Sequence, residues 1–215
     1  MKKFELTTNT KMFLGKKLFQ IKALISFGDV KAGELGGYIE KEENLSQTGD
    51  AWVFDNAWVS GDARVSGNAW VTDNARVTDN ARVFDNAWVS GDARVSGNAR
   101  VFDNAWVSGN ARVFDNAWVS DNARVSDNAR VSGDAWVSDN ACYTTIKGFG
   151  REYRTTTFFR CKDGKVRVQC GCFYGDLKEF RAIVKKTHGE SKKAKEYLMI
   201  ADLMELHFEE NENDK

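Results

Sequence analysis

The chain has 215 residues, and its 31 Lys and Arg balance 31 Asp and Glu, so the formal net charge is zero. This length allows one large domain or two small ones. No apolar run approaches the ~18–20 residues of a membrane span, and the N-terminus lacks the apolar core of a secretion signal. Four cysteines do not make a disulfide framework in a chain this long. We therefore expect a cytoplasmic protein that does not enter a membrane.

Residues 1–50 show no fixed period. The run Leu18–Phe27 alternates loosely and predicts a strand, residues 28–29 predict a turn, and Val30–Ile39 predicts a returning strand. Another apolar residue, Leu45, comes shortly before the regular part of the chain. We interpret this segment as an N-terminal cap with one degenerate coil, because an uncapped solenoid would expose an open sheet edge.

Residues 51–140 are fifteen copies of one hexad. Each hexad reads Ala, then Trp or Arg, then Val, then Ser, Thr or Phe, then Gly or Asp, then Asn or Asp. Small apolar residues on either side of a variable one predict a strand of about four residues with one buried face. Gly, Asn and Asp tolerate positive φ, so a sharp corner is expected after each strand.

The variable second position of the hexad indicates how many hexads close one coil. With three hexads per coil, Trp and Arg separate into continuous blocks, whereas two hexads per coil scramble them. The first column is Trp52, Trp70, Trp88, Trp106 and Arg124; the second is Trp58, Arg76, Arg94, Arg112 and Arg130; the third is Arg64, Arg82, Arg100, Trp118 and Trp136. We therefore predict a triangular β-solenoid of five coils, roughly 24 Å long at about 4.8 Å per strand.

The hexad resembles the Val-x-x-x-Ala-x repeat of left-handed parallel β-helix proteins, the hexapeptide-repeat family. The left hand is implied by this resemblance alone, because it departs from the usual right-handed crossover. The stretch VKAGELGGYIEKEENLS at residues 30–46 resembles the cap of phage and prophage hexapeptide-repeat proteins, often labelled polymer-forming cytoskeletal proteins. The predicted fold is mainly β: a left-handed parallel β-helix with an N-terminal cap and a small C-terminal α+β domain.

The period fails after Asn140. Two runs, Thr155–Cys161 and Lys165–Phe173, predict strands joined by a turn at residues 162–164. Together with two helices they predict an α+β domain over residues 141–208, and residues 209–215 predict a disordered acidic tail.

Capping residues delimit the two helices. Asp176 and Glu179 form a capping box at the start of the first, and Gly189 ends it. Ser191 begins the second helix, which extends to about Phe208. The apolar face of the first helix is predicted to be Leu177, Phe180, Ile183 and Val184, and that of the second Ala194, Tyr197, Leu198, Ala201 and Met204.

The residues able to carry chemistry argue against an enzyme. An acyltransferase on this fold needs a general base beside the coil, normally His, yet His188 and His207 both fall in the predicted C-terminal helices. A zinc site of three His is excluded by count. Cys170 and Cys172 point to opposite strand faces, which does not suit a zinc site shared with Cys161 and His188. We predict no catalytic residue, no metal and no cofactor.

The hexad corners carry ladders of Asp and Asn. Stacked carboxylates attract Ca²⁺, but turn formation and Asn side-chain ladders explain the same columns, and we favour that interpretation. The columns are Asp85, Asp103, Asp121 and Asp139, and Asn68, Asn86, Asn104, Asn122 and Asn140.

Ala and Val are expected to point inward, so the residues at the second position point outward. The first column then presents four stacked Trp, beginning with Phe54 at one end, and such an aromatic strip is more than a monomer normally leaves bare. Either the C-terminal domain or a second subunit covers it, or it binds a partner. The predicted residues are Trp52, Trp70, Trp88 and Trp106.

The second column presents four Arg about 5 Å apart, which repel by on the order of 1–3 kcal/mol per neighbour if unscreened. Corner residues such as Asp79 and Asp115 offset this charge, or the column awaits an anionic partner, either nucleic-acid phosphates or an acidic protein. The predicted partner-binding residues are Arg76, Arg94, Arg112 and Arg130.

From these faces and the resemblance to phage proteins, we predict a non-enzymatic binding protein in the cytoplasm of a bacterial host. Its rigid surface is expected to engage and inhibit a host protein or nucleoprotein complex, such as a nucleic-acid-handling or defence complex. One alternative is a structural scaffold that self-associates into dimers or oligomers through the Trp face. A second alternative is a diverged acyltransferase whose base comes from elsewhere.

Overall fold

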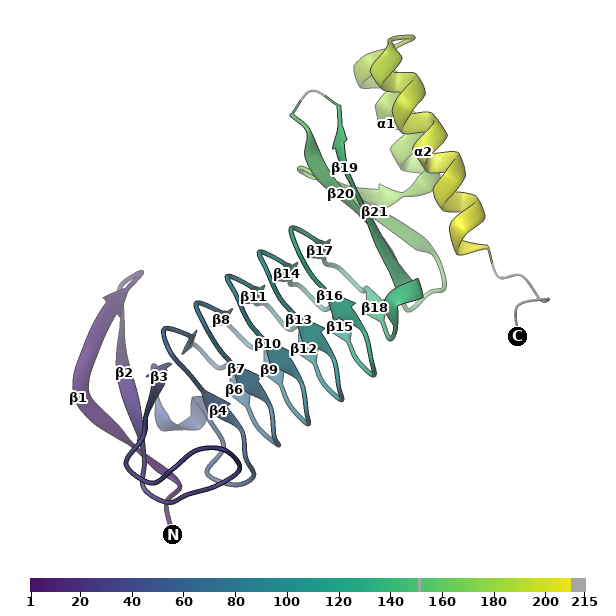
Figure 1. Cartoon of the computed structure of the whole chain (residues 1–215). Coiled ribbons are helices and arrows are strands. Elements are labelled where there is room, and N and C mark those ends of the chain that lie inside the picture. The colour runs from purple at the N-terminus through teal and green to yellow at the C-terminus, as the bar shows by residue number, and fades with distance from the viewer. Residues whose placement is uncertain (151, 210–215) are drawn as a thin grey trace.

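The structure is a computed structural model that describes residues 1–150 and 152–209. A regular solenoid lies between an N-terminal group of strands and a C-terminal sheet with two helices (Figure 1). The predicted tail begins at Glu209, but residues 210–215 lie outside the described residues. No helix in the described part of the chain has the length and apolarity to cross a membrane.

Three parallel sheets form the solenoid, one for each column of the sequence. Trp88 pairs with Trp70 on one side and with Trp106 on the other, which confirms the coil of 18 residues. The first face consists of β4 (Trp52–Val53), β7 (Trp70–Val71), β10 (Trp88–Val89), β13 (Trp106–Val107) and β16 (Arg124–Val125). The second face consists of β5 (Trp58–Val59), β8 (Arg76–Val77), β11 (Arg94–Val95), β14 (Arg112–Val113) and β17 (Arg130–Val131). The third face consists of β6 (Arg64–Val65), β9 (Arg82–Val83), β12 (Arg100–Val101), β15 (Trp118–Val119) and β18 (Trp136–Val137).

The Ala and Val of every hexad line the core, where each is at most 1% exposed, so the predicted inward set is confirmed. The strands are shorter than predicted, with two residues in place of about four. The reason is that the alanine belongs to the corner: the N–H of Ala57, for example, donates to the carbonyl of Phe54. The corner therefore uses part of the hexad that the alternation had suggested was strand.

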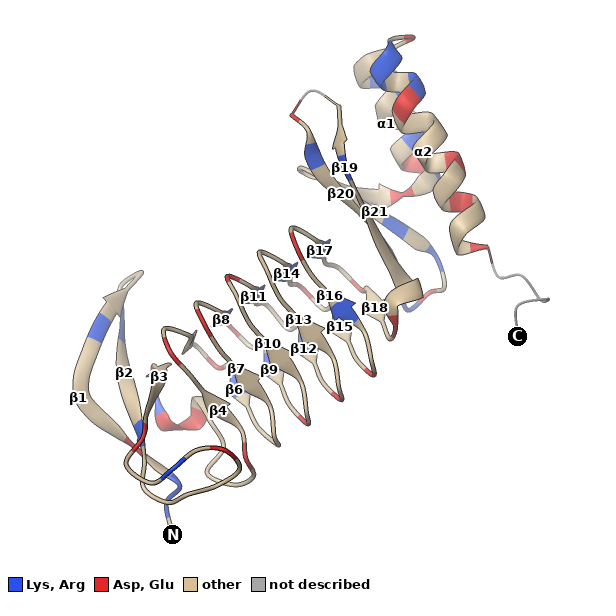
Figure 2. Ribbon diagram, viewed as in Figure 1, with Lys and Arg blue, Asp and Glu red and all other residues tan. Residues whose placement is uncertain are grey.

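Turn chemistry accounts for the corner columns. Asp85, Asp103 and Asp121 have positive φ, as predicted for this position. The prediction is wrong for Asp139, the last member of the column, which has φ −151° because it caps the 3₁₀ helix at residues 140–142. The amide of Asn68 donates to Asn86 (3.0 Å) and that of Asn86 donates to Asn104 (3.3 Å). Glycine is required where coils approach closely: a Cβ on Gly67 would lie 2.7 Å from the backbone nitrogen of Asp85. Figure 2 shows acidic residues at these corners along the solenoid. Among the described residues, no cluster of His, Cys, Asp or Glu has the arrangement of a metal site.

The N-terminal segment differs from the prediction. β1 (Phe4–Phe13), which was not predicted, forms an antiparallel hairpin with β2 (Lys16–Ala23). The predicted strand Leu18–Phe27 is wrong at its C-terminal end, because the chain leaves the sheet after Ala23 and closes a turn between Phe27 and Val30.

A partial coil joins this hairpin to the regular coils. β3 (Leu35–Ile39) pairs with β2 on one side and runs parallel to β5 on the other, so the predicted strand Val30–Ile39 is confirmed only in its second half. After the 3₁₀ helix η1 (Glu42–Asn44), Leu45 pairs with Val65 on the third face.

The C-terminal region is an antiparallel sheet of four strands with two helices. The strands follow one another in the sheet as β19 (Tyr143–Phe149), β20 (Arg154–Arg160), β21 (Val166–Cys170) and β22 (Phe173–Asp176). The predicted run Lys165–Phe173 is therefore two strands, split at a turn that contains Gly171 at φ 61°. A second short 3₁₀ helix, η2 (Asn140–Cys142), connects the last coil to β19.

The helices confirm the predicted caps. α1 (Leu177–His188) begins with the Asp176–Glu179 capping box and ends at Gly189, and α2 (Lys192–Phe208) follows the N-cap Ser191. One predicted core residue is wrong: Ile183 is 37% exposed, because the buried side of α1 is centred on Phe180 and Val184.

Candidate functional site

The first face does not present four bare Trp side chains. Trp52 is fully buried, because Phe4 and Phe27 pack against its indole with ring centroids 6.1 and 5.3 Å away. The predicted exposure of Trp52 is therefore wrong. The expected cover was the C-terminal domain or a second subunit, whereas the N-terminal segment covers this end of the column.

The other three Trp of this face shield one another. Trp88 stacks on Trp106 with centroids 5.0 Å apart and planes 6° apart, and it meets Trp70 edge-on at 5.7 Å. The indole N–H of Trp106 donates to Ser90 in the preceding coil (3.2 Å). Among these three, Trp88 is exposed, at 38%, whereas Trp70 and Trp106 are partly buried. The Trp side chains of the first face thus pack mainly on one another, and Trp88 is the one most exposed to solvent.

The second face carries the predicted Arg column in register, but its two ends are occupied. The guanidinium of Arg76 lies 4.9 Å from the Phe13 ring of the N-terminal hairpin. Arg130 donates from Nη1 to the carbonyl of Gly171 in the C-terminal sheet (3.4 Å), and its backbone N–H donates to Thr157. Arg94 and Arg112, in the middle, are exposed.

The corner carboxylates beside this column are used for other contacts. Asp79 accepts from the backbone N–H of Gly97 (3.2 Å), and Asp115 accepts from that of Gly133 (3.3 Å). No ion pair among the described residues includes a solenoid arginine. The pKa of Arg112 lies below its ordinary value, because of partial burial first and then the charges of Arg94 and Arg130. Within residues 1–150 and 152–209, the column is therefore a row of like charges without direct acidic partners.

A groove of about 410 Å³ follows the middle of the second face. Arg94, Arg112 and Arg130 line it together with Phe114 and the two corner residues Asp79 and Asp115. The guanidinium groups are thus accessible along a continuous strip, which suits contacts with a row of carboxylates or phosphates.

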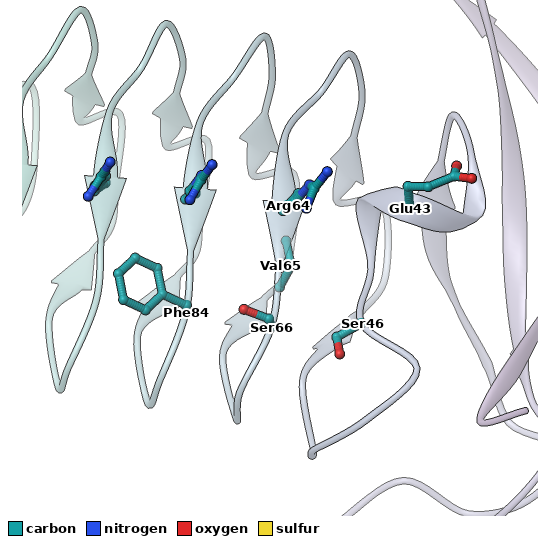
Figure 3. Close-up of a pocket in the computed structure, with 8 residues that line it drawn as sticks. Glu43, Ser46, Arg64, Val65, Ser66 and Phe84 are labelled. Atoms are coloured by element: carbon teal, nitrogen blue, oxygen red, sulfur yellow. The ribbon is translucent and has the colours of Figure 1, made fainter. Parts of the chain in front are cut away.

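The third face has a second Arg column, which was not among the predicted partner-binding residues. Arg64, Arg82 and Arg100 lie in register on β6, β9 and β12. They line a groove of about 440 Å³ with Ser46, Ser66 and Phe84. Figure 3 shows Arg64, Val65 and Ser66 on one coil of this face and the Phe84 ring on the next coil. The segregation of the third column into three Arg and two Trp was the signal that could have identified it.

The histidines lie on the C-terminal helices, as the sequence predicted. His188 stacks on Tyr197 with centroids 5.9 Å apart, and His207 lies against Phe208. Cys170 and Cys172 are partly buried and exposed, respectively, while Cys161 is buried.

Comparison with protein families adds to this picture of the repeats. A family model described as YdcK Beta solenoid repeat matches residues 57–73, 75–91, 93–109, 105–121 and 123–139. Each match covers close to one coil of the solenoid. The coils of this chain are therefore similar to the YdcK β-solenoid repeat. The matches lie within residues 57–139 and outside both terminal regions. They therefore describe the fold of the solenoid and say nothing about a ligand. A comparison with curated proteins finds no match.

Proposed function

We propose that this chain is a non-enzymatic binding protein that engages an anionic macromolecule through the second face of its solenoid. The observation that carries the proposal is the pair Arg94 and Arg112, two exposed guanidinium groups in register on a parallel sheet, which form no ion pair with any residue that the structure describes. Because Arg94 and Arg112 lie on neighbouring strands, their positive charges repel each other and destabilise the free protein. A bound anionic partner would offset this repulsion. Arg is suited to this role because its planar fork bonds carboxylate and phosphate in pairs.

The biological setting is part of the same proposal. The resemblance of residues 30–46 to hexapeptide-repeat proteins of phages and prophages motivates a protein that acts in the cytoplasm of a bacterial host. There it would occlude a host protein or nucleoprotein complex, for example one that handles nucleic acid or provides defence. A rigid scaffold suits occlusion, because the charged row keeps its spacing when it binds.

The experiment compares three proteins in a pull-down from bacterial lysate, with and without nuclease. The wild type is expected to retain a partner at ~50 mM salt and to lose it progressively toward ~200 mM. Its affinity for the partner is expected to fall by up to about a thousandfold over this range if six phosphates are engaged. Arg94→Glu/Arg112→Glu is expected to lose the partner, with a cost of several kcal/mol, and to keep the fold. Arg94→Lys/Arg112→Lys preserves the positive charge but removes the planar guanidinium group. Its affinity therefore shows how much of the binding depends on paired hydrogen bonds rather than on charge. Retention of the same partner by the Glu variant at both salt concentrations would refute the proposal.

A further inference from the structure

The groove on the third face combines two rows of side chains that point to the same side of the sheet. The second position of a hexad lies in the strand and the fourth follows it two residues later, and on this face Arg82 and Phe84 line the same groove. On this face the second position supplies Arg64, Arg82 and Arg100, and the fourth supplies Ser66, Phe84 and Phe102. Phenylalanines on neighbouring coils occur at the fourth position on this face only.

Acidic side chains beside the N-terminal end of the cationic row make their contacts elsewhere: Asp62, which lies near Arg64, forms its ion pair with Lys41 at 2.6 Å. The carboxylate of Glu43 lines the N-terminal end of the groove, but it extends away from Arg64 (Figure 3). Asn44, which precedes the row, is buried and donates to the carbonyls of Gly61 and Ala63. At the other end Lys162 places its ammonium 3.7 Å from the Trp118 ring centroid and adds a fourth positive charge.

The aromatic row is continuous over three coils. Phe84 stacks on Phe102 with centroids 5.0 Å apart and planes 2° apart, and Phe102 meets Trp118 edge-on at 6.1 Å. Both phenylalanines remain partly exposed. Ser46 and Ser66, at the N-terminal end of this row, are small and leave open the volume in front of Phe84.

We propose that this third-face groove binds single-stranded nucleic acid, with phosphates on the guanidinium row and bases against Phe84 and Phe102. A positively charged groove beside aromatic side chains is the arrangement by which proteins hold single strands without sequence preference. Duplex nucleic acid keeps its bases stacked inside and offers only phosphates to this surface. An acidic protein segment would use the guanidinium groups but gain nothing specific from the aromatic row. The inference does not depend on the proposed function, which concerns the second face.

The test is fluorescence anisotropy of a labelled oligonucleotide of about 12 thymidines at low salt. We expect the wild type to bind, and Phe84→Ser to weaken binding about tenfold because base stacking is removed. Serine already occupies the equivalent positions 66 and 120, so this change suits the coil. Ile183→Ser, which removes an exposed apolar side chain from α1 outside both grooves, is the control and is expected to leave the affinity unchanged. Arg82→Glu is expected to weaken binding at least tenfold and to lower the salt slope by about 0.7 for each phosphate that is no longer neutralised.

Three results with the wild type and Phe84→Ser would overturn the inference, as would loss of binding in Arg94→Glu/Arg112→Glu but not in Arg82→Glu. They are no binding by the wild type, equal affinity for the wild type and Phe84→Ser, and displacement of the oligonucleotide by polyglutamate at equal charge. The variant Arg94→Glu/Arg112→Glu separates the two faces. If Arg94→Glu/Arg112→Glu abolishes oligonucleotide binding while Arg82→Glu and Phe84→Ser do not, the strand lies on the second face. The inference then fails while the proposed function stands. If it leaves oligonucleotide binding intact but loses the lysate partner, the two faces act independently.

Discussion

The ammonium group of Lys3 is buried at the end of the solenoid, where it donates a hydrogen bond to the carbonyl oxygen of Ala51, 2.9 Å away. It also donates to the carbonyl of Gly49 and lies 4.8 Å from the Phe27 ring centroid. A residue near the N-terminus thus satisfies backbone carbonyls that the first coil would otherwise leave unpaired. Burial lowers the pKa of Lys3 from 10.5 to about 8, with Asp50 opposing the shift.

This pKa predicts how stability depends on pH. Between pH 8 and 10.5 the unfolded chain keeps a proton on Lys3 that the folded chain has released. The Lys3 contribution to the free energy of unfolding therefore rises with pH across that window, by up to about 3 kcal/mol. Denaturant titrations of wild type and Lys3→Met at several pH values isolate this contribution, because other groups titrate equally in both proteins. A constant difference between the two proteins from pH 8 to 10 would contradict the prediction.

The solenoid core should not tolerate charge. Val95 is fully buried in the middle coil, so Val95→Asp places a carboxylate in an apolar interior and is expected to cost several kcal/mol. The neighbouring Ser96 points outward, and Ser96→Asp is the control that should change stability little. Urea unfolding measures both. A soluble Val95→Asp protein with wild-type stability would show that the inward assignment is wrong.

The Trp face is the candidate surface for self-association. We expect Trp70→Ala/Trp88→Ala to lose the stacked rings and, if the face joins two copies, to be monomeric at concentrations where the wild type is larger. Sedimentation velocity across a concentration series measures this difference. A wild type that is monomeric throughout, together with unchanged partner binding by the double variant, would argue against both roles of this face.

The cysteines should differ in reactivity. Burial raises the pKa of the Cys161 thiol to about 11, whereas Cys172 is exposed. Since the thiolate is the reactive form, a thiol reagent at pH 8 should modify Cys172 quickly and Cys161 only after unfolding. Replacing Cys172 by Ser should remove the fast phase. Rapid modification of Cys161 in the native protein would contradict its burial.

Much of the fold followed from the sequence because the repeat is strict. The 18-residue period of Trp and Arg predicted which residues pair, and Trp88 does pair with Trp70 and Trp106. Three features depend only on local geometry and on the stacking of equivalent residues in successive coils. They are the inward Ala and Val, the corner Asp at positive φ and the Asn ladders. The helix caps at Asp176 and Ser191 were likewise local signals.

What covers each end of the columns was decided by tertiary structure. Trp52 and Arg94 occupy the same position of the hexad, yet one is fully buried and the other is exposed. The difference comes from Phe4 and Phe27, which are distant in sequence from the coil they cover and follow no period. The groove beside Phe84 likewise arises only when coils stack and bring Arg and Phe from successive turns together. The repeat determines which residues pair between successive coils, because its period is local and regular. Burial of the ends of the solenoid depends on contacts with segments of unrelated sequence, and no period in the sequence predicts those contacts.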